Sequence, residues 1–297
     1  MIRNAPQPMT EESPPAELEP AGDGKMWIDG RFRPQLRRAR LTVFEEVMDS
    51  NGGRCLRELK VRENWYLPAP EPQPSARGLY LKKHYVRTWL SRLRAALGIG
   101  PGETPARVEA DNVRCLTAEG IDVMRVVAFG EKLHADGLCE SFLLTEELAG
   151  YADLHAFLLR RFPSGGPRRG TTAARDLDRL IRGVADVARR FHNAGYNHRD
   201  FYSCHFLVKE TSPGEFDIRL IDLQRVQHRR RFRRRWLVKD LAQLAWSAPR
   251  DRVTCRQRIA FMRHYLGVRK LGPAEKRLIR AVLFKQRLMQ WRLGDEP

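Results

Sequence analysis

The side chains best suited to chemistry lie in two short segments of the C-terminal half. The first, Asn197-His198-Arg199-Asp200, follows a helical stretch that stops near Gly195, and the second, Ile221-Asp222-Leu223, ends a short apolar run. Phosphoryl transfer needs one carboxylate at the attacking hydroxyl, another on magnesium and a lysine on the phosphates. Asp200 suits the first role and Asp222 suits the second.

A lysine for the phosphates is available at Lys82, at the end of the strand-like stretch Leu79-Tyr80-Leu81-Lys82. Glu109 lies on the next predicted helix, where a carboxylate partner for that lysine is required. Taken alone, Glu109 fits a solvated helix face equally well. Lys83 is a rival for Lys82, but successive side chains on a strand point to opposite faces, so only one of them can reach the cleft.

Each of these features has an ordinary explanation when taken singly. A His-Arg-Asp tripeptide can be a surface turn, and an aspartate at a strand end can be a cap. Their order along the chain, with Lys82 and Glu109 in a β-rich half and both aspartates in a helix-rich half, favours a kinase instead. We therefore predict an α+β, protein-kinase-like two-lobed fold with a β-rich N-lobe carrying one main helix and an α-rich C-lobe.

The pattern of apolar residues predicts the elements of the N-lobe. Residues 1–25 are rich in Pro and Glu and are expected to form a disordered tail. The N-lobe is expected over residues 26–147 and the C-lobe over residues 148–297. Strands are predicted over 41–48 and 54–61, forming a hairpin around the turn at 49–53, and also over 78–83, 123–129 and 141–146. The main helix is predicted over 105–118.

The C-lobe is expected to be mostly helical. Helices are predicted over 151–160, over 173–193 with Gly195 as a C-cap, and from 238 toward the end. Two short strands, at 205–209 and 216–223, interrupt them. The chain has no G-x-G-x-x-G, so Ser50-Asn51-Gly52-Gly53 is the single candidate for a phosphate-covering loop, and a plain hairpin turn explains it equally well.

The composition points to an anionic partner. The chain has 54 Lys and Arg against 36 Asp and Glu, a formal charge of +18. Such a field attracts nucleic acid, anionic membranes or acidic substrates, although an arginine-rich genome would also produce it. The absence of a nucleic-acid-binding motif argues against nucleic acid. Five singly spaced cysteines, and no apolar run of about 20 residues, suit a reducing cytosol and a chain that does not cross a membrane.

Longer motifs carry a family resemblance. Asn197 to Tyr202 with Cys204-His205-Phe206-Leu207, and Ile221-Asp222-Leu223 through Trp236 to Lys239-Asp240-Leu241, resemble the lipopolysaccharide core heptose kinases of Gram-negative bacteria. The resemblance extends through Tyr80-Leu81-Lys82, Glu109, residues 127–132 and residues 145–148, so it covers most of the chain after about residue 40.

This resemblance implies an ATP- and Mg²⁺-dependent kinase that phosphorylates the first heptose of the lipopolysaccharide inner core. Asp200 would be the catalytic base within a loop that includes His198 and Arg199. Lys82 and Glu109 would hold the ATP phosphates, Asp222 would hold the metal, and Asp240 would be a structural brace for the catalytic loop. A cytoplasmic enzyme at the inner face of the cytoplasmic membrane is expected.

Two departures from protein kinases leave questions open. His205 occupies the position where protein kinases carry a metal-binding Asn; it could contact the metal or only order the loop, because magnesium prefers oxygen ligands. Asp222 is followed by Leu223-Gln224 rather than Phe-Gly, which argues against a flipping activation segment.

The basic run over 229–235 begins shortly after Asp222, where a kinase binds its acceptor. Arg229, Arg233, Arg234 and Arg235 are therefore candidates to bind the phosphates and carboxylates of an anionic glycolipid and to contact an anionic membrane surface. A solvated loop is the plain alternative. Kdo, another sugar or a protein remain alternative acceptors, and a non-catalytic basic binding protein on a kinase scaffold remains the alternative from another class.

Overall fold

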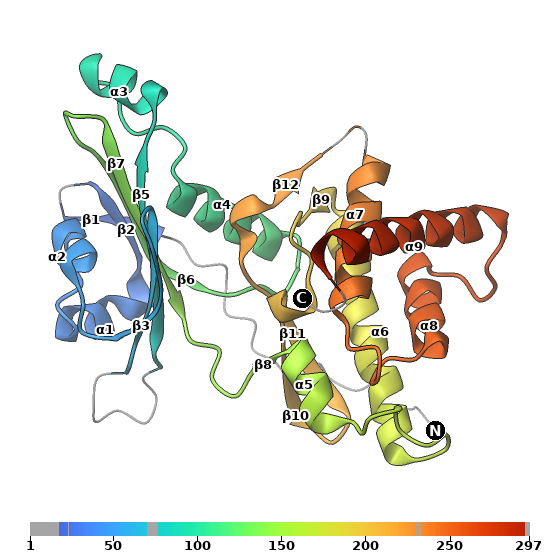
Figure 1. The fold of residues 1–297 in the computed structure, drawn as a ribbon. Coiled ribbons are helices and arrows are strands. Elements are labelled where there is room, and N and C mark those ends of the chain that lie inside the picture. The colour runs from blue at the N-terminus through green and yellow to red at the C-terminus, as the bar shows by residue number, and fades with distance from the viewer. Residues whose placement is uncertain (1–17, 23, 70–76, 230, 232, 295–297) are drawn as a thin grey trace, which may run out of the picture.

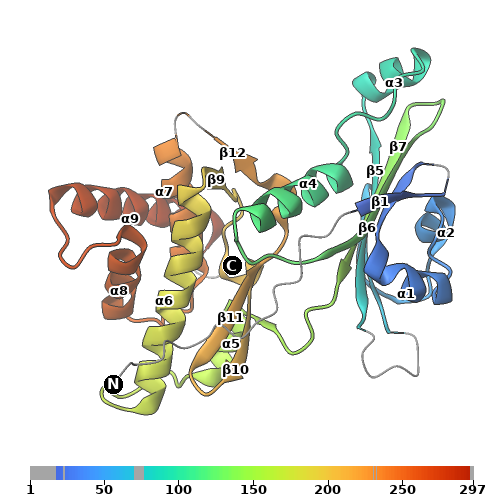
Figure 2. The same ribbon diagram turned by 180° about the vertical axis from the view of Figure 1, so that it is seen from behind.

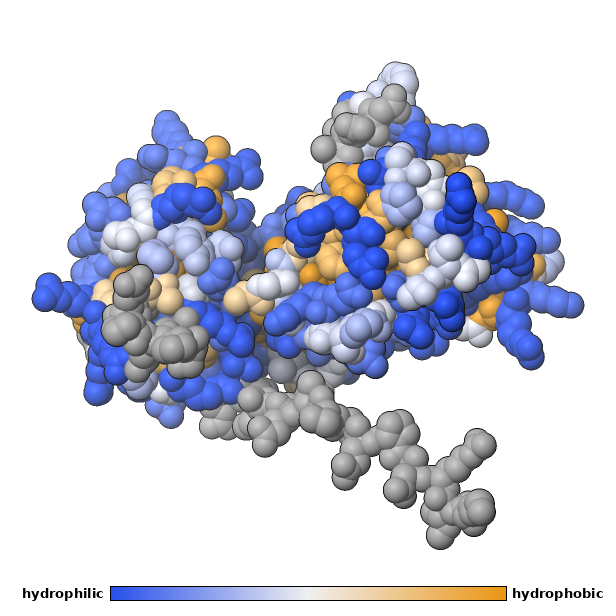
Figure 3. All heavy atoms as spheres, turned by 90° about the horizontal axis from the view of Figure 1, so that it is seen from below, coloured by the Kyte–Doolittle hydropathy of each residue, from blue (hydrophilic) through white to orange (hydrophobic). Residues whose placement is uncertain are grey.

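The computed structural model describes residues 18–22, 24–69, 77–229, 231 and 233–294. They form two lobes, one built on a β-sheet and one mainly helical (Figure 1). The space-filling view shows the molecule hollowed between the two lobes (Figure 3).

The N-terminal lobe is built on an antiparallel sheet, whose strands in the described residues run in the order β1-β2-β6-β7-β5-β4-β3. The strands are β1 (Leu18–Ala21), β2 (Met26–Asp29), β3 (Arg54–Leu59), β4 (Arg62–Leu67), β5 (Leu79–Arg87), β6 (Val126–Leu133) and β7 (Leu138–Glu146). Strand β5, next to the central strand β7, pairs with β7 along its whole length and with β4 over residues 79–84, so that Lys82 lies opposite Asn64 and Leu143. This pairing fixes which side chains of β5 face each side of the sheet.

The two faces of this sheet are covered by different helices. The short helices α1 (Arg33–Arg38) and α2 (Phe44–Asp49) cover one face, where Leu81 is buried in the same apolar cluster as Phe44. Helix α4 (Pro105–Ala118) covers the other face and packs on β6 and β7. Figures 1 and 2 show α4 between the sheet and the helical lobe, whereas α3 (Trp89–Ala96) projects beyond the sheet. Because Leu81 faces α2, Lys82 faces α4 and the second lobe.

The strand predicted over 41–48 is wrong, because these residues form α2. Phe44, Val47 and Met48 are buried with the i, i+3, i+4 spacing of one helix face. The Glu46 carboxylate accepts hydrogen bonds from the backbone N–H groups of Thr42 and Val43, which would otherwise be unpaired at the helix start. The predicted hairpin around 49–53 is therefore also wrong: β3 pairs with β4, and residues 50–53 connect α2 to β3.

The second lobe is built around a long amphipathic helix, α6 (Thr172–Asn193), whose apolar face is buried against the other elements. The other helices are α5 (Leu154–Arg161), α7 (Arg233–Ser247), α8 (Cys255–Leu266) and α9 (Pro273–Leu293). The short strands are β8 (Ala152–Asp153), β9 (Tyr196–Asn197), β10 (Phe206–Ser212), β11 (Glu215–Leu220) and β12 (Gln227–His228). Gly195 follows α6 with φ +96°, a left-handed conformation that favours glycine.

Backbone hydrogen bonds connect the two lobes next to the predicted metal aspartate. The N–H of Met124 donates to the carbonyl of Leu220, and the N–H of Leu220 donates to the carbonyl of Asp122 (3.1 and 3.0 Å). The segment that leads into β6 is thus held against β11, two residues before Asp222.

Most predicted elements are found within a few residues of their expected bounds. Two boundaries differ: α7 begins at Arg233 rather than 238, and residues 18–21 of the predicted tail form β1 at the edge of the sheet. The rest of that tail, over 1–17, lies outside the described residues. The division of the chain after residue 147 stays a prediction.

Candidate active site

Lys82 lies at the centre of a chain of charges between the lobes. Its Nζ is 2.7 Å from Glu109 Oε1 on α4 and 3.2 Å from Asp222 Oδ1, which follows β11. The Glu109 side chain is fully buried, and its Oε1 also accepts a hydrogen bond from the backbone N–H of Leu223 (3.2 Å). The structure therefore brings to Lys82 two carboxylates that lie 27 and 140 positions away from it in sequence.

The electrostatics of this group keep Lys82 and Asp222 charged. Burial opposes the charge on Lys82, but Glu109 and Asp222 outweigh it and raise the pKa of Lys82 above its usual value. Burial likewise opposes the charge on Asp222, yet Lys82, His205 and Arg62 lower the pKa of Asp222 to about 2. A carboxylate that stays ionised beside a cationic lysine suits the binding of a metal and phosphates.

Lys83 points to the other side of the sheet. Its Nζ donates to the carbonyl of Ser50 (2.8 Å) and lies 3.6 Å from Glu63 Oε2. Burial lowers the pKa of Lys83, although Glu63 partly offsets this. Alternation along β5 thus separates the two lysines as expected, and Lys82 is the one that faces Glu109.

Asp200 lies in a loop whose backbone is held by a neighbouring helix. The buried Asp240 carboxylate of α7 accepts hydrogen bonds from the N–H groups of His198 (2.8 Å) and Arg199 (3.0 Å). Arg199 has φ +71°, a conformation that non-glycine residues adopt only when the surroundings enforce it. Gln243 and Ser247 on the same face of α7 accept from the N–H groups of Phe201 and Ser203.

Arg225 holds the Asp200 side chain. Its Nη1 lies 2.9 and 2.8 Å from the two carboxylate oxygens of Asp200. Arg225 itself follows Asp222 in a segment that α4 fixes, because Asn112 Nδ2 donates to the carbonyl of Leu223 (2.8 Å). One helix, α4, therefore fixes both Lys82, through Glu109, and the segment that presents Arg225 to Asp200.

His205 connects the catalytic loop to Asp222. Its Nδ1 donates to the carbonyl of Asp200 (2.6 Å), and its Nε2 lies 3.6 Å from Asp222 Oδ2. Burial opposes the charge on His205, but Cys204, the Asp200 carbonyl and Asp222 raise the pKa of His205 to about 9. His198 bonds in a similar way, from its Nε2 to the carbonyl of Ile221 (3.1 Å). These two contacts fix the Asp222 segment relative to the loop that carries Asp200.

Comparison with known proteins agrees with this geometry. The Lipopolysaccharide kinase (Kdo/WaaP) family matches residues 47–265. The chain belongs to this family. It is 33% identical over 223 residues to the lipopolysaccharide core heptose(I) kinase WaaP of Pseudomonas aeruginosa, covering 74% of this chain and 79% of that protein. It is 31% identical over 242 residues to the WaaP of Escherichia coli K12, covering 80% of this chain and 87% of that protein.

A solved structure described as "WaaP in complex with acyl carrier protein" has the same fold. Its TM-score is 0.60 at 30% identity, and the match covers 88% of this chain and 95% of that chain. The kinase-like α+β fold and the family resemblance are confirmed, and the chain is a kinase. The roles of the individual site residues stay predictions.

Sequence reasoning missed the roles of several residues that hold this candidate site together. Arg225 lies within the motif from Ile221 to Trp236 but received no role, and Asn112, Gln243 and Ser247 have no motif of their own; the partners of these four residues lie 25, 111, 42 and 44 positions away in sequence. The spacing of Asp240, Gln243 and Ser247, which places all three on one helix face, is the signal that could have indicated two of them.

Over the residues that the structure describes, the basic run is not a solvated loop. Arg233, Arg234 and Arg235 form the first turn of α7. The guanidinium of Arg233 donates to the carbonyl of His192, so this side chain is turned into the lobe. The guanidiniums of Arg229 and Arg235 lie over the ring of Trp236, 4.6 and 4.7 Å from its centroid.

Two further cations, Arg199 of the catalytic loop and Lys239 of α7, also lie over the ring of Trp236. Arg199 lies 5.2 Å and Lys239 5.9 Å from the ring centroid, and Lys239 donates to the carbonyl of Arg199. Cations over an aromatic face are attracted by its quadrupole. The ring therefore gathers four positive charges beside the loop that carries Asp200.

Proposed function

We propose that this chain transfers the γ-phosphoryl group of ATP to a hydroxyl of heptose I in the lipopolysaccharide inner core. The observation that carries the proposal is the ion pair of Lys82 with Asp222, which His205 connects to the loop of Asp200, in a chain whose curated relatives are named heptose(I) kinases. A lysine for phosphates, a carboxylate for the metal and a carboxylate for the acceptor are the groups that phosphoryl transfer needs.

The residues around Asp222 fit a magnesium ion that is bound together with nucleotide. The Asp222 carboxylate is partly exposed between the lobes, and in the described part of the chain no group of three or more His, Cys, Asp or Glu side chains is arranged to hold a metal ion by itself. Magnesium in kinases takes one or two carboxylates and completes its coordination with phosphates and water. Bound there, it would neutralise charge on the phosphates. Lys82 would hold the phosphates, with Glu109 keeping its ammonium in place.

Asp200 is proposed as the group that orients the acceptor hydroxyl and takes its proton. Arg225 positions the Asp200 carboxylate and keeps an opposite charge beside it. We propose that His205 acts as a charged clamp between Asp222 and the loop rather than as a metal ligand. Its Nδ1 donates to the carbonyl of Asp200 and its Nε2 faces Asp222 Oδ2 at 3.6 Å, and magnesium prefers oxygen to nitrogen ligands.

The turn between β3 and β4 is the better candidate for the loop that covers the phosphates. Arg62, directly after this turn, contributes to the lowered pKa of Asp222, which places its charge near the site. Ser50 to Gly53 instead lie before β3, on the side of the sheet that Lys83 faces.

Anionic groups of the acceptor are proposed to bind the cations around Trp236. Arg229 and Arg235 present guanidinium groups there, and guanidinium matches phosphate or carboxylate through paired hydrogen bonds. Arg234 lies on the same turn, whereas Arg233 is better explained as a contact to the end of α6.

The test is phosphate transfer from labelled ATP to inner-core lipopolysaccharide dephosphorylated at the heptose. We expect transfer to that acceptor and not to Kdo, other sugars or generic protein. Asp200→Asn should lower turnover by about 10²-fold or more, because general-base contributions are typically of that size. Turnover above half of the wild-type value would remove Asp200 from the proposed role. If wild-type protein transferred no phosphate to any of these acceptors, a non-catalytic binding protein would be the better description.

An acyl chain is a second proposed ligand, since the solved relative is a complex with acyl carrier protein. A cavity of about 340 Å³ lies between α5, α6, α7, α8 and α9, and its lining in the described residues is apolar apart from Arg258 and Gln286. Both polar side chains donate to the carbonyl of Ala245. Apolar surface of the helical lobe is visible in Figure 3. Acylated carrier protein should bind more tightly than the unacylated form, and equal binding would refute this use of the cavity.

Contact with a membrane surface is proposed through α3. In the described chain no helix has the length and apolar character to cross a bilayer. The residues on and just after α3 are nevertheless unusually apolar for a surface: Trp89 is 77% and Leu97 62% exposed, and Leu93 and Ile99 are also exposed. Arg92 and Arg94 lie on the same helix. An interfacial helix has this combination of apolar and basic residues.

Flotation with phosphatidylglycerol vesicles tests this contact. Trp89→Ser with Leu97→Ser should lower the bound fraction, whereas Trp291→Ser on α9, equally exposed at 81%, serves as the matched control. Equal loss in both variants would show that α3 has no special part in binding.

A further inference from the structure

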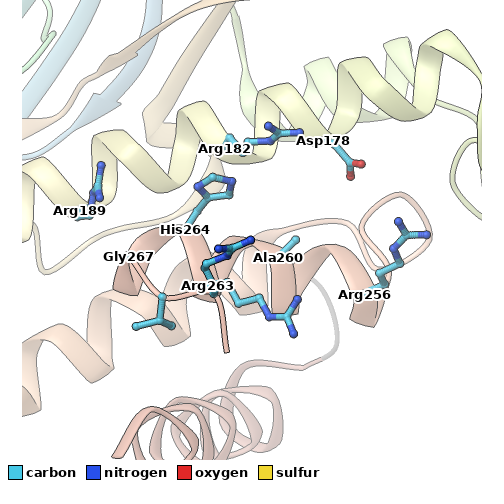
Figure 4. A pocket seen from close by; sticks show the side chains of 10 residues that line it. Asp178, Arg182, Arg189, Arg256, Ala260, Arg263, His264 and Gly267 are labelled. Atoms are coloured by element: carbon cyan, nitrogen blue, oxygen red, sulfur yellow. The ribbon is translucent and has the colours of Figure 1, made fainter. Parts of the chain in front are cut away.

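The strongest feature outside the kinase site is a cavity lined by arginines between α6 and α8 (Figure 4). It has a volume of about 580 Å³. In Figures 1 and 2, α6 lies between α8 and the β-sheet lobe, so this cavity is on the far side of α6 from the sheet. The charged side chains that line it are Asp178, Arg182, Arg189, Arg256, Arg263 and Arg269, together with His264.

The spacing of these residues places them on facing sides of the two helices. Asp178, Arg182 and Arg189 share one face of α6, and Arg256, Arg263 and His264 share one face of α8. The small residue Ala260 on that face of α8 and Gly267, which directly follows α8, leave room between the helices. Figure 4 shows Asp178 directed toward α8 and His264 directed toward α6.

The positive charges of this cavity are poorly compensated. Among the described residues, the side chains of Arg182, Arg256, Arg263 and Arg269 have no hydrogen bond or ion pair, and Asp178 is the one carboxylate in the lining. Arg189 alone has an ion pair, with Asp186 Oδ1 at 2.8 Å. By contrast, Arg161, Arg179 and Arg190 elsewhere in this lobe each face a carboxylate within 4 Å. Like charges around one cavity repel unless an anion binds among them.

From this arrangement we propose that the α6–α8 cavity is a second anion site, which binds a ligand carrying two or more phosphate charges. Phosphate is the best match because guanidinium groups bind its oxygens in pairs, and arginines from two helices can hold adjacent phosphates at once. The apolar cavity is lined by other residues of the same two helices, among them Leu180, Ile181 and Ile259, and shares no lining residue with the arginine cavity. Binding at the anion site is therefore separate from the acyl chain and from the ATP site.

Titration calorimetry with sodium pyrophosphate, without magnesium and at fixed ionic strength, tests the site. Arg182→Gln with Arg263→Gln removes one guanidinium from each helix, and affinity should fall about tenfold or more, since each charge-assisted contact corresponds to about that factor. Arg277→Gln with Arg287→Gln on α9 removes the same charge from exposed positions outside the cavity and should leave affinity within about twofold. Lys82→Ala should weaken pyrophosphate binding at the ATP site alone. The pyrophosphate binding that remains in this variant should therefore be that of the cavity.

The source of the phosphate is distinguished by a second arm with phosphatidylglycerol and phosphatidylcholine vesicles. Loss of phosphatidylglycerol binding in the cavity variant, with the α9 control unchanged, would assign the site to a lipid headgroup. Loss of pyrophosphate binding alone would assign it to a soluble anion. If the cavity variant matched the α9 control with both ligands, the proposal would be overturned. The proposal would also be overturned if the cavity variant bound pyrophosphate and vesicles as the control does but lost its binding to acyl carrier protein, because the arginines would then form a protein-docking surface.

Discussion

Asp240 holds the backbone of the catalytic loop in place, so Asp240→Asn should destabilise the fold. The Asp240 carboxylate is fully buried and accepts two backbone N–H groups, from His198 at 2.8 Å and Arg199 at 3.0 Å. In Asp240→Asn, the single amide oxygen can accept one of them, and the amide N–H₂ group would face the other donor. Loss of a hydrogen bond to a charged group typically costs about 1.5–3 kcal/mol, and an unpaired buried donor costs about 1–3 kcal/mol. We therefore expect the free energy of unfolding to fall by about 3 kcal/mol or more.

The same substitution should lower turnover. Arg199 is held at φ +71°, so a loop that relaxes after losing the brace would move Asp200, which is the next residue. A displacement of about 1 Å at a reacting group can reduce the rate by about 10²-fold. The Michaelis constant for ATP should change little, because Asp240 contacts neither Lys82 nor Asp222.

Urea denaturation followed by tryptophan fluorescence, with steady-state kinetics on the same preparations, measures both effects. Asp111→Asn is the control, since Asp111 forms an exposed ion pair with Arg114 and has no hydrogen bond with the loop. A loss of less than about 1 kcal/mol together with turnover above half of wild type would refute the brace.

Three further predictions concern single residues of the site. Lys82→Ala should abolish turnover and weaken ATP binding much more than Lys83→Ala, as measured by kinetics and nucleotide titration; the reverse order would move the phosphate lysine by one position. Arg225→Gln should lower kcat by about tenfold or more with little change in the Michaelis constant for ATP, because it removes the group that positions Asp200, and an unchanged kcat would contradict this. Burial, aided by the charge of His205, lowers the pKa of His198 to about 4, below an unfolded value of about 6.5, so the unfolded chain takes up a proton first as the pH falls. The contribution of His198 to stability should therefore be fully present above pH 6.5 and fall by up to about 3 kcal/mol toward pH 4 in urea titrations. His198→Gln should flatten that dependence, and an equal slope in this variant would contradict the assignment.

Local sequence signals determined much of the secondary structure. The helix over 105–118 has Pro105 at its start, where a missing N–H costs nothing, and the structure gives the same bounds. The short region over 41–48 was misassigned because its apolar residues suit either period, and burial against β6 and β7 selected the helix. Local patterns of this length cannot decide between strand and helix without their tertiary partners.

The sequence by itself determined which residue types could carry the chemistry. Asp200, Asp222, Lys82 and Glu109 were predicted because phosphoryl transfer requires such charged groups and a kinase carries them in the same order along its chain, and alternation on a strand separated Lys82 from Lys83. Only the tertiary structure decided what holds them. The contacts of Arg225 with Asp200, of Asn112 with Leu223 and of Gln243 with Phe201 join residues far apart in the chain. The same is true of the arginines that face each other from α6 and α8. Such contacts depend on how helices and loops pack, and a hydrogen bond or a charge between distant residues leaves no periodic trace in the sequence.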